Sequence, residues 1–130
     1  MKNVKNIAAL IILIIVTTMI NYSCQPEEAP NAVVIVIDEN NEPVKDAQVF
    51  VRAFNYQDEA TVIYLEDGSV PIQDVRYTDK DGKVFYDFKY EAIYKVEVYV
   101  EGNYHEPNRT GSGTLFLEND KTEEITIKVH

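Results

Sequence analysis

The residue types that nucleophilic catalysis combines are scarce in this chain. After residue 24 there are two serines, Ser69 and Ser112, and two histidines, His105 and His130. A serine becomes reactive only when a base and an orienting group lie within hydrogen-bond reach. Ser112 and His105 share one segment, but neither serine stands in a G-x-S-x-G nucleophile motif. The sequence therefore predicts no catalytic residues, and a small hydrolase remains an alternative.

Metal ligands are equally sparse. Asp79, Asp81 and Gly82 have the opening spacing of a calcium-binding loop, but its later ligands are missing. Asp and Gly are also the residues that a tight turn requires, so turn formation accounts for all three. The two histidines lie far apart in the sequence, and the chain has one cysteine. We therefore expect no metal ion and no soluble cofactor.

Aromatic side chains are the better candidates for ligand binding. Five of them alternate away from the positions that we assign to a core: Phe50, Phe54, Phe85, Tyr99 and Phe116. Exposed together, they would form a patch for a glycan or a protein. The alternative is that part of this outer face is buried under a loop, or that the two faces are exchanged. The long loops add further candidates, because loops commonly carry binding residues: Tyr56, Tyr64, Tyr104 and Arg109.

The elements that would position these side chains are β-strands. Apolar and polar residues alternate in several segments, and none after Cys24 repeats with the 3.6-residue period of a helix. The following alternating positions are predicted to face a core: Ala47, Val49, Val51, Ala53, Val84, Tyr86, Phe88, Tyr90, Tyr94, Val96, Val98, Val100, Ile125, Ile127 and Val129. About seven short strands with polar turns predict one all-β domain over residues 31–130, an Ig-like antiparallel β-sandwich.

The turns between the segments indicate how the strands connect. Residues 75–100 are expected to form two or three adjoining strands at the centre of the fold, turned back at residues 78–82. Residues 31–38 and 46–54 are expected to pair as a hairpin. A last hairpin is expected from residues 114–118 and 122–130.

Two segments lack a regular pattern. Residues 102–113, GNYHEPNRTGSG, are predicted to be a long polar loop. Residues 55–71 are predicted to be an irregular insertion with a short strand at 61–65, and no role is evident for this insertion.

The first 23 residues are predicted to be a localisation signal. Lys2 and Lys5 precede an uncharged apolar run over residues 7–20, which is too short at about 21 Å to cross a hydrocarbon layer of about 30 Å. That layout is typical of a signal peptide. Cys24 follows the small residue Ser23, and the arrangement resembles the lipobox of bacterial lipoproteins of the Bacteroidetes type. An ordinary signal anchor with an incidental cysteine is the alternative.

The lipobox resemblance implies acylation of Cys24 and cleavage before it. Two or more acyl chains anchor a protein firmly, whereas one binds reversibly. Residues 24–30 would then be the lipidated cysteine followed by a tether, because two prolines and two acids cannot bury apolar surface. The acidic residues after the cysteine also resemble the export signal that sends Bacteroidetes lipoproteins to the cell surface; a plain linker is the alternative. The predicted location is the outer membrane.

Length and charge limit the classes of function. The 130 residues suffice for one domain, and the formal charge is −10, with 12 basic and 22 acidic residues. Removal of Lys2 and Lys5 with the signal peptide makes the remainder still more acidic. Such a surface repels phosphate backbones, so we expect no nucleic-acid partner.

Three motifs together resemble the carboxypeptidase regulatory-like domains. These are VIDENNEPVKDAQV at residues 36–49, TDKDGKV at 78–84 and AIYKVEV at 92–98. The resemblance covers residues 31–130 and implies a transthyretin-like, or prealbumin-like, β-sandwich that serves as a non-catalytic accessory module. Asn41 and Asp46 stand where that family has glycines.

The sequence thus predicts a lipid-anchored, non-enzymatic module at the outer membrane that binds another envelope component. A carbohydrate-binding lipoprotein serving glycan uptake is the alternative function. The expected partners are the membrane itself, through Cys24, and an envelope protein or glycan.

Overall fold

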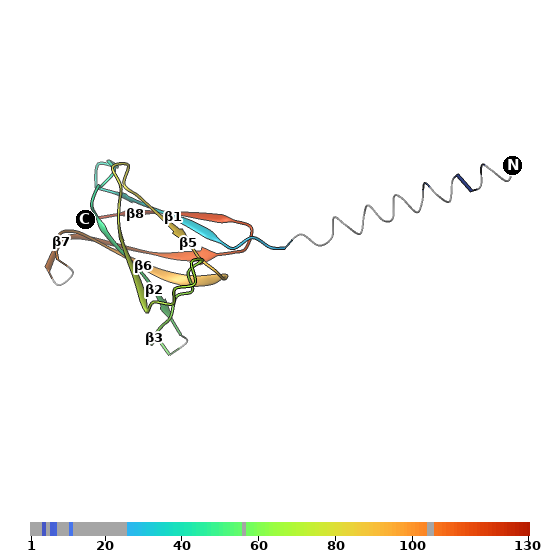
Figure 1. Cartoon of the computed structure of the whole chain (residues 1–130). Helices are drawn as coiled ribbons and strands as arrows, with labels where there is room; N and C mark the ends of the chain where they lie inside the picture. The colour runs from blue at the N-terminus through green and yellow to red at the C-terminus, as the bar shows by residue number, and fades with distance from the viewer. Residues whose placement is uncertain (1–3, 5, 8–10, 12–25, 56, 104–105) are drawn as a thin grey trace.

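The computed structural model of the chain describes residues 4, 6–7, 11, 26–55, 57–103 and 106–130. Apart from four single positions, the predicted signal peptide lies outside the described residues, as do Cys24, Tyr56, Tyr104 and His105. The remainder folds into eight strands that form two sheets, which confirms the prediction of an all-β sandwich with one strand more than expected (Figure 1).

The smaller sheet has three strands in the order β5-β1-β8. Their bounds are Asn31–Ile37 for β1, Lys83–Asp87 for β5 and Thr122–Lys128 for β8. The central strand β1 runs antiparallel to β5 and parallel to β8. The β1–β8 pair is therefore not a hairpin but the result of a crossover between sheets.

The larger sheet has five strands, and β2 is its most connected member. Its strands are β2 (Gln48–Phe54), β3 (Ala60–Thr61), β4 (Gln73–Tyr77), β6 (Ala92–Asn103) and β7 (Glu106–Leu117). β2 pairs with β6 on one edge and with β4 and β3 on the other, and β7 follows β6. All these pairs are antiparallel.

The core lies between the two sheets, and the predicted alternation fills it. The inward residues of β2 and β6 are buried as predicted. So are the predicted inward residues on and just after β5 and β8: Val84, Tyr86, Phe88, Ile127 and Val129. Three rings stack across the interior: Tyr86 and Phe88 have centroids 5.7 Å apart, and Phe88 and Tyr94 4.8 Å. Tyr90 is an exception, because β5 ends at Asp87 and the Tyr90 side chain is 51% exposed.

The predicted strand pairing is wrong at every hairpin. Residues 31–38 and 46–54 enter different sheets, and so do the strands predicted to pair at the C-terminal end. The stretch 75–100 is likewise divided, since β4 and β6 pair with β2 while β5 pairs with β1. The physical reason is that alternation identifies the residues that face a core, and both sheets of a sandwich face the same core.

The crossing from β4 to β5 depends on a tight turn. Asp79 Oδ1 accepts hydrogen bonds from the backbone N–H groups of Asp81 and Lys83, so the carboxylate of Asp79 stabilises the turn. Gly82 has a φ of 71°, and a Cβ there would lie 2.6 Å from the Val36 carbonyl oxygen. Buried Thr78 anchors the same crossing, because its hydroxyl donates to Val44 O and accepts from Ala47 N–H.

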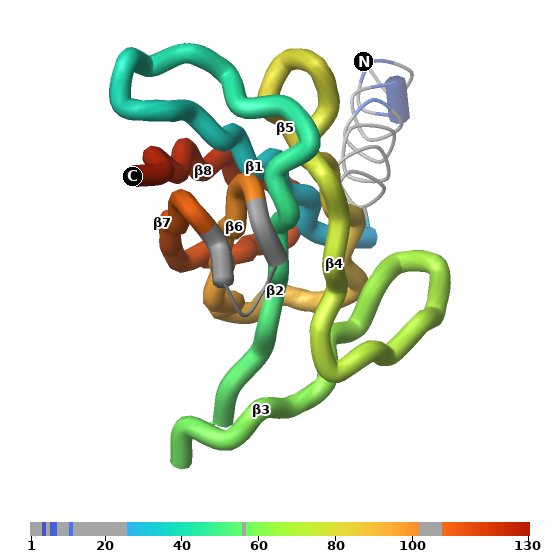
Figure 2. The backbone as a smooth tube through the Cα atoms, turned by 90° about the vertical axis from the view of Figure 1, so that its left-hand side faces the viewer, coloured from blue at the N-terminus to red at the C-terminus, as the bar shows by residue number. Residues whose placement is uncertain are grey.

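Both segments without a regular pattern differ from their predictions. Residues 102–113 are not a loop, because β6 and β7 pair through most of that segment. The glycines that indicated a loop leave room for the other sheet: a Cβ on Gly111 would lie 2.6 Å from Ile127 Cγ2. In the insertion the strand is β3, which ends at Thr61, and the buried Ile63 and Leu65 follow it. Figure 2 shows this segment, in green, extending away from the two sheets.

Two departures from the family motifs are explained by the backbone. Asn41 and Asp46 have φ values of 65° and 57°, in the left-handed region that favours glycine. Asn and Asp are the next most tolerant residues there. Asn41 and Asp46 therefore adopt the backbone geometry that glycine would also allow.

Candidate binding face

The strand register arranges the outer face of the larger sheet in four rows across its strands. The first row contains Tyr77, Gln48, Tyr99 and Thr110; the second Val75, Phe50, Glu97 and Ser112; the third Gln73, Arg52, Lys95 and Thr114. The fourth, which we call the apolar row, contains Phe54, Ile93 and Phe116. Each row crosses three or four strands, so side chains distant in sequence become neighbours.

At the centre of this face, an aromatic contact buries a side chain that points outward. Phe50 is only 5% exposed although it points away from the core, and its ring meets Tyr99 edge-on at 5.3 Å. The Arg52 guanidinium lies 5.2 Å from the Phe50 ring centroid. The hypothesis of one exposed patch of five aromatic side chains is therefore wrong at Phe50. It is also wrong at Phe85, which is exposed on the smaller sheet.

Beside this contact lies a cluster of two cations and one anion. Glu97 accepts from Arg52 at 3.0 Å and from Lys95 at 3.1 Å. The Arg52 and Glu97 side chains are only 20% and 19% exposed. The cluster has a local excess of positive charge on a chain whose formal charge is −10. It therefore offers a cation to a ligand that carries an anionic group.

The apolar row lies beside a depression of about 500 Å³, which Phe54 and Ile93 line and Phe116 does not. Its members remain accessible, with exposed fractions of 36% for Phe54, 62% for Ile93 and 57% for Phe116. Polar groups complete the lining of the depression: Asn55, Lys95, Ser112 and Thr114. Apolar walls with a few polar groups suit an apolar group that has polar substituents.

The sequence did not single out Ile93, although a signal was present. Ile93 alternates with Lys95, Glu97 and Tyr99, which places it on the outer face by the same rule that selected Tyr99. Selecting only aromatic residues missed it. Of the five aromatic candidates, Phe54 lines the depression and Phe116 is exposed beside Ile93, whereas the buried Phe50 contacts the half-buried Tyr99.

Of the serine and histidine candidates, the structure places Ser112 near His130, and His105, which shares a segment with Ser112, lies outside the described residues. Ser112 and His130 line one depression of about 350 Å³ with Glu97, because the His130 and Thr110 backbones exchange two hydrogen bonds of 3.1 Å. No hydrogen bond joins Ser112 to His130 among the described residues. Ser69 lies in a separate turn, where its N–H donates to Asp67 Oδ1 at 2.8 Å.

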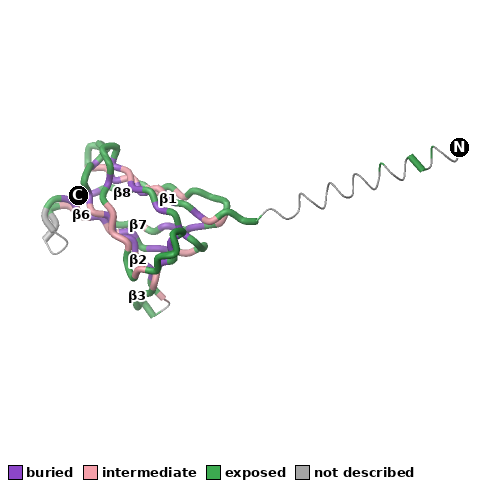
Figure 3. Tube along the Cα trace, in the orientation of Figure 1, coloured by how far each residue is buried: buried purple, intermediate pink, exposed green. Residues whose placement is uncertain are grey.

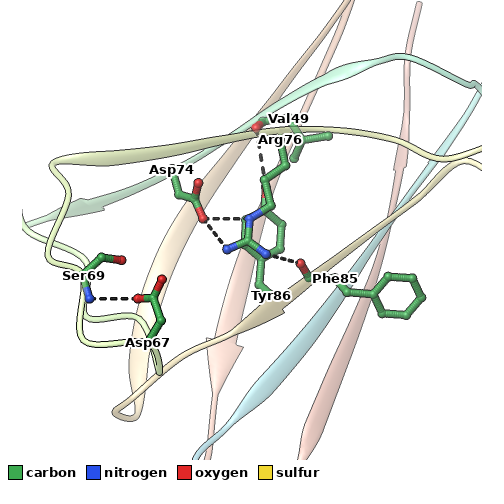
Figure 4. Close-up of polar contacts among 7 residues, drawn as sticks. All are labelled: Val49, Asp67, Ser69, Asp74, Arg76, Phe85 and Tyr86. Carbon is green, nitrogen blue, oxygen red and sulfur yellow. Dashed lines mark hydrogen bonds and ion pairs between the residues drawn. The ribbon is translucent and has the colours of Figure 1, made fainter.

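A polar cluster on the edge between the sheets is structural. Arg76 donates to Asp74 at 2.8 and 2.9 Å and to Phe85 O at 2.6 Å, and its guanidinium lies 4.5 Å from the Tyr86 ring (Figure 4). Burial raises the pKa of Tyr86 well above its ordinary range. Arg76 thus ties β4 to β5 across the open side of the sandwich.

The remaining loop candidates have separate partners. Tyr64 packs edge-on against Tyr90 at 5.4 Å, and both rings are partly exposed. Arg109 donates to Glu101 at 2.9 Å. Neither lies on the rows of the binding face. Within residues 26–55, 57–103 and 106–130, no three His, Cys, Asp or Glu side chains converge as a metal site requires. The parts of the chain that the structure describes contain no helix long and apolar enough to cross a membrane.

Comparison with known proteins supports the fold and leaves the family open. The chain matches no known protein-family model and no curated protein. It is similar to a streptococcal ancillary pilin, with a TM-score of 0.55 and 14% identity over 78% of this chain. It is also similar to a candidate carbohydrate-binding protein from Pseudomonas aeruginosa, with a TM-score of 0.51 and 8% identity over 83% of this chain and 93% of that one.

The chain spans only 32% of the length of the pilin. At such identities the likeness shows the fold alone, a β-sandwich that is also found in bacterial proteins. Fold and outer face together are consistent with an accessory or binding module.

Proposed function

We propose that this chain is a non-enzymatic binding module, anchored at the outer membrane by acyl chains on Cys24, and that it binds another envelope component through the apolar row. The observation that carries the proposal is the joint exposure of Ile93 and Phe116, which pair between β6 and β7, and of Phe54, which lines a depression together with Ile93. Contiguous apolar surface on a soluble domain is a marker of interaction sites. The same sheet buries Phe50, so exposure of the apolar row is not a general property of this face.

The anchor rests on the layout of residues 1–24. A basic start, an apolar run too short to span a membrane, and a cysteine behind a small residue support acylation of Cys24. The acyl lipid would be the sole added group, and two or more chains would hold the module firmly. The acidic residues Glu27 and Glu28 support export to the cell surface.

The absence of catalysis belongs to the same proposal. Ser112 and His130 share a depression, but the serine has no base in hydrogen-bond contact among the described residues. Alanine at His105 or His130 should leave binding unchanged, whereas alanine at Ser112, which also lines the depression beside the apolar row, is used to test turnover only. A measured turnover that these substitutions abolish, with folding intact, would instead make the chain a small hydrolase.

The test uses two phenylalanines with the same exposure on opposite sheets. Phe116 and Phe85 are each 57% exposed. Tagged, lipidated protein is recovered from gently solubilised membranes of its own organism, as wild type, Phe116→Ser and Phe85→Ser. We expect a stoichiometric envelope partner that Phe116→Ser loses and Phe85→Ser retains. Equal recovery by the two variants would show that the apolar row is not the binding site.

Carbohydrate binding is the second candidate function. The depression beside Phe54 combines an aromatic ring with amide and hydroxyl groups, and the similar protein from Pseudomonas aeruginosa is described as a candidate carbohydrate binder. Calorimetric titration with a panel of polysaccharides tests it. Heat that Phe54→Ser removes and Phe85→Ser keeps would support a glycan ligand at the depression, and flat titrations across the panel would leave the protein partner.

A further inference from the structure

The residues predicted to be a free tether are bound to the domain. Glu28 N–H donates to Asp120 Oδ1 at 2.7 Å, and Asp120 N–H donates to Glu28 O at 3.0 Å. Glu27 accepts from Asn119 Nδ2 at 2.8 Å, while Pro30 is fully buried and its carbonyl accepts from Phe88 N–H. We call residues 27–30 with the β7–β8 turn at 118–121 the clamp. Residues 27–30 are thus held against the domain instead of extending away from it.

The clamp leaves only a very short linker between Cys24 and the domain. Only Gln25 and Pro26 separate Cys24 from Glu27, so the Cα atoms of Cys24 and Glu27 are at most about 11 Å apart. A tether that was free as far as residue 30 would reach about 20 Å. The end of the sandwich that contains the clamp must then lie close to whatever holds Cys24.

The apolar row lies at that same end. Phe116 is the last residue but one of β7 and lies two residues before the clamp turn begins, and Ile93 is the second residue of β6. Glu91, just before β6, accepts from the Asn119 N–H in the clamp turn at 3.1 Å. Figure 1 shows the start of β6 and the end of β7 on the side where the chain enters the domain.

From this geometry we propose that the occupant of the apolar row is an envelope protein embedded in the same membrane as the anchor. The inference rests on the proposed function and names its partner. A row on the face of a sheet points sideways when the end of that sheet is held at the membrane. The row therefore meets a neighbour standing on the same surface. Confinement of both proteins to one membrane raises their effective concentration, so a small contact suffices.

The lipid surface itself is the less suitable occupant. The clamp end is acidic, with five carboxylates against two ammonium groups: Glu27, Glu28, Glu91, Glu118 and Asp120 against Lys89 and Lys121. Anionic headgroups repel such a surface. The apolar row instead adjoins the cluster of Arg52, Lys95 and Glu97, with its positive excess. The partner should therefore present an apolar side chain flanked by a carboxylate.

Lengthening the linker between Cys24 and the clamp is the first part of the test. Twenty Gly/Ser residues inserted between Gln25 and Pro26 leave the clamp intact and add an r.m.s. reach of about 25 Å. Because the longer linker lets the domain move away from the membrane surface, its effective concentration at a membrane-embedded partner falls, and recovery of the partner should fall severalfold. The same twenty residues appended after His130 are the control and should change nothing. Undiminished recovery of the partner by the variant with the lengthened linker would overturn the proposal.

Photo-crosslinking in the living cell is the second part. A benzoyl-phenylalanine replacing Phe116 should crosslink to a protein that mass spectrometry identifies as membrane-embedded, and the same group replacing Phe85 should not. Adducts with lipid alone, or with a soluble protein, would overturn the proposal and leave the binding module standing. No crosslink from position 116, together with full recovery by Phe116→Ser, would remove the proposed function itself. Membrane retention of Cys24→Ala would show separately that the lipid anchor is wrong.

Discussion

The two outer faces of this sandwich are built from similar alternating strands and differ in what they bury. On the three-stranded sheet, Phe85 stands 57% exposed, and Val33 and Ile35 of the central strand are half-buried. On the five-stranded sheet, Phe50 is 5% exposed, and the Arg52 and Glu97 side chains are about one-fifth exposed. Figure 3 shows the buried positions, in purple, along the strands of both sheets.

The difference follows from the neighbours of each position. Phe50 lies on a strand with partners on both edges, so Val75 and Glu97 flank it and Tyr99 meets its ring. Phe85 lies on β5, which pairs with β1 on one edge only. A side chain on an outer face is therefore buried where long side chains surround it on both sides, and the apolar row is exposed because it lies at the end of the sheet.

Truncating the two outer phenylalanines should give the largest contrast. We expect Phe50→Ala to lower the free energy of unfolding by about 3 kcal/mol, since it removes a buried ring and opens a cavity. Phe85→Ala should cost less than about 1 kcal/mol, because that ring is mostly in water already. Denaturant unfolding of both variants measures the contrast. Equal losses would mean that the two outer faces are packed alike.

Alanine substitution of two turn glycines compares the connection between the sheets, at Gly82, with a turn inside the insertion, at Gly68. Gly82→Ala should destabilise the fold by about 2–3 kcal/mol, because positive φ is strained and the new Cβ meets the Val36 carbonyl at 2.6 Å. Gly68 has a φ of 87° and open space around it, so Gly68→Ala should cost about 1 kcal/mol. Thermal unfolding of the pair checks this order, and a larger loss at Gly68 would contradict it.

The smallest effect concerns the carboxylate at the crossing from β1 to β2. The Glu42 N–H, and then the Asn40 N–H, donate to Asp38 at 2.9 and 2.8 Å and lower the pKa of its carboxyl below 3.8. A pKa lowered by folding gives a stabilisation that is present above 3.8 and is lost as the pH falls through the folded value. Asp38→Asn should thus be less stable than wild type at pH 5, and the gap in melting temperature should narrow toward pH 3. A gap that stays constant with pH would exclude this carboxylate as its source.

Much of the inner architecture could be predicted because it is local. Alternation along β2 and β6 identified Val49, Val51, Val96 and Val98 as core residues, and all four are buried. Positive φ at Asn41 and Asp46 agrees with the glycines that the family motif has there. These properties depend on the pleat of one strand or the backbone of one turn, which neighbouring residues determine.

The candidate site could be predicted only in part. Phe54 and Phe116 were identified from their alternation, but their position beside Ile93 requires the register between β2, β6 and β7. The separation of Phe85 from them requires knowing that β5 joins the other sheet. Such pairings join residues that are far apart in the chain, and no short-range pattern encodes them.

The sequence by itself thus determined an all-β domain, most of its inward positions and an acidic net charge, because pleat, turn chemistry and charge are properties of short segments. Only the tertiary structure decided which sheet each strand joins, that Phe50 is buried and that residues 27–30 are held by the β7–β8 turn. The physical reason is that both sheets enclose one core. A strand with one apolar face fits either sheet, and contacts between distant residues make the choice.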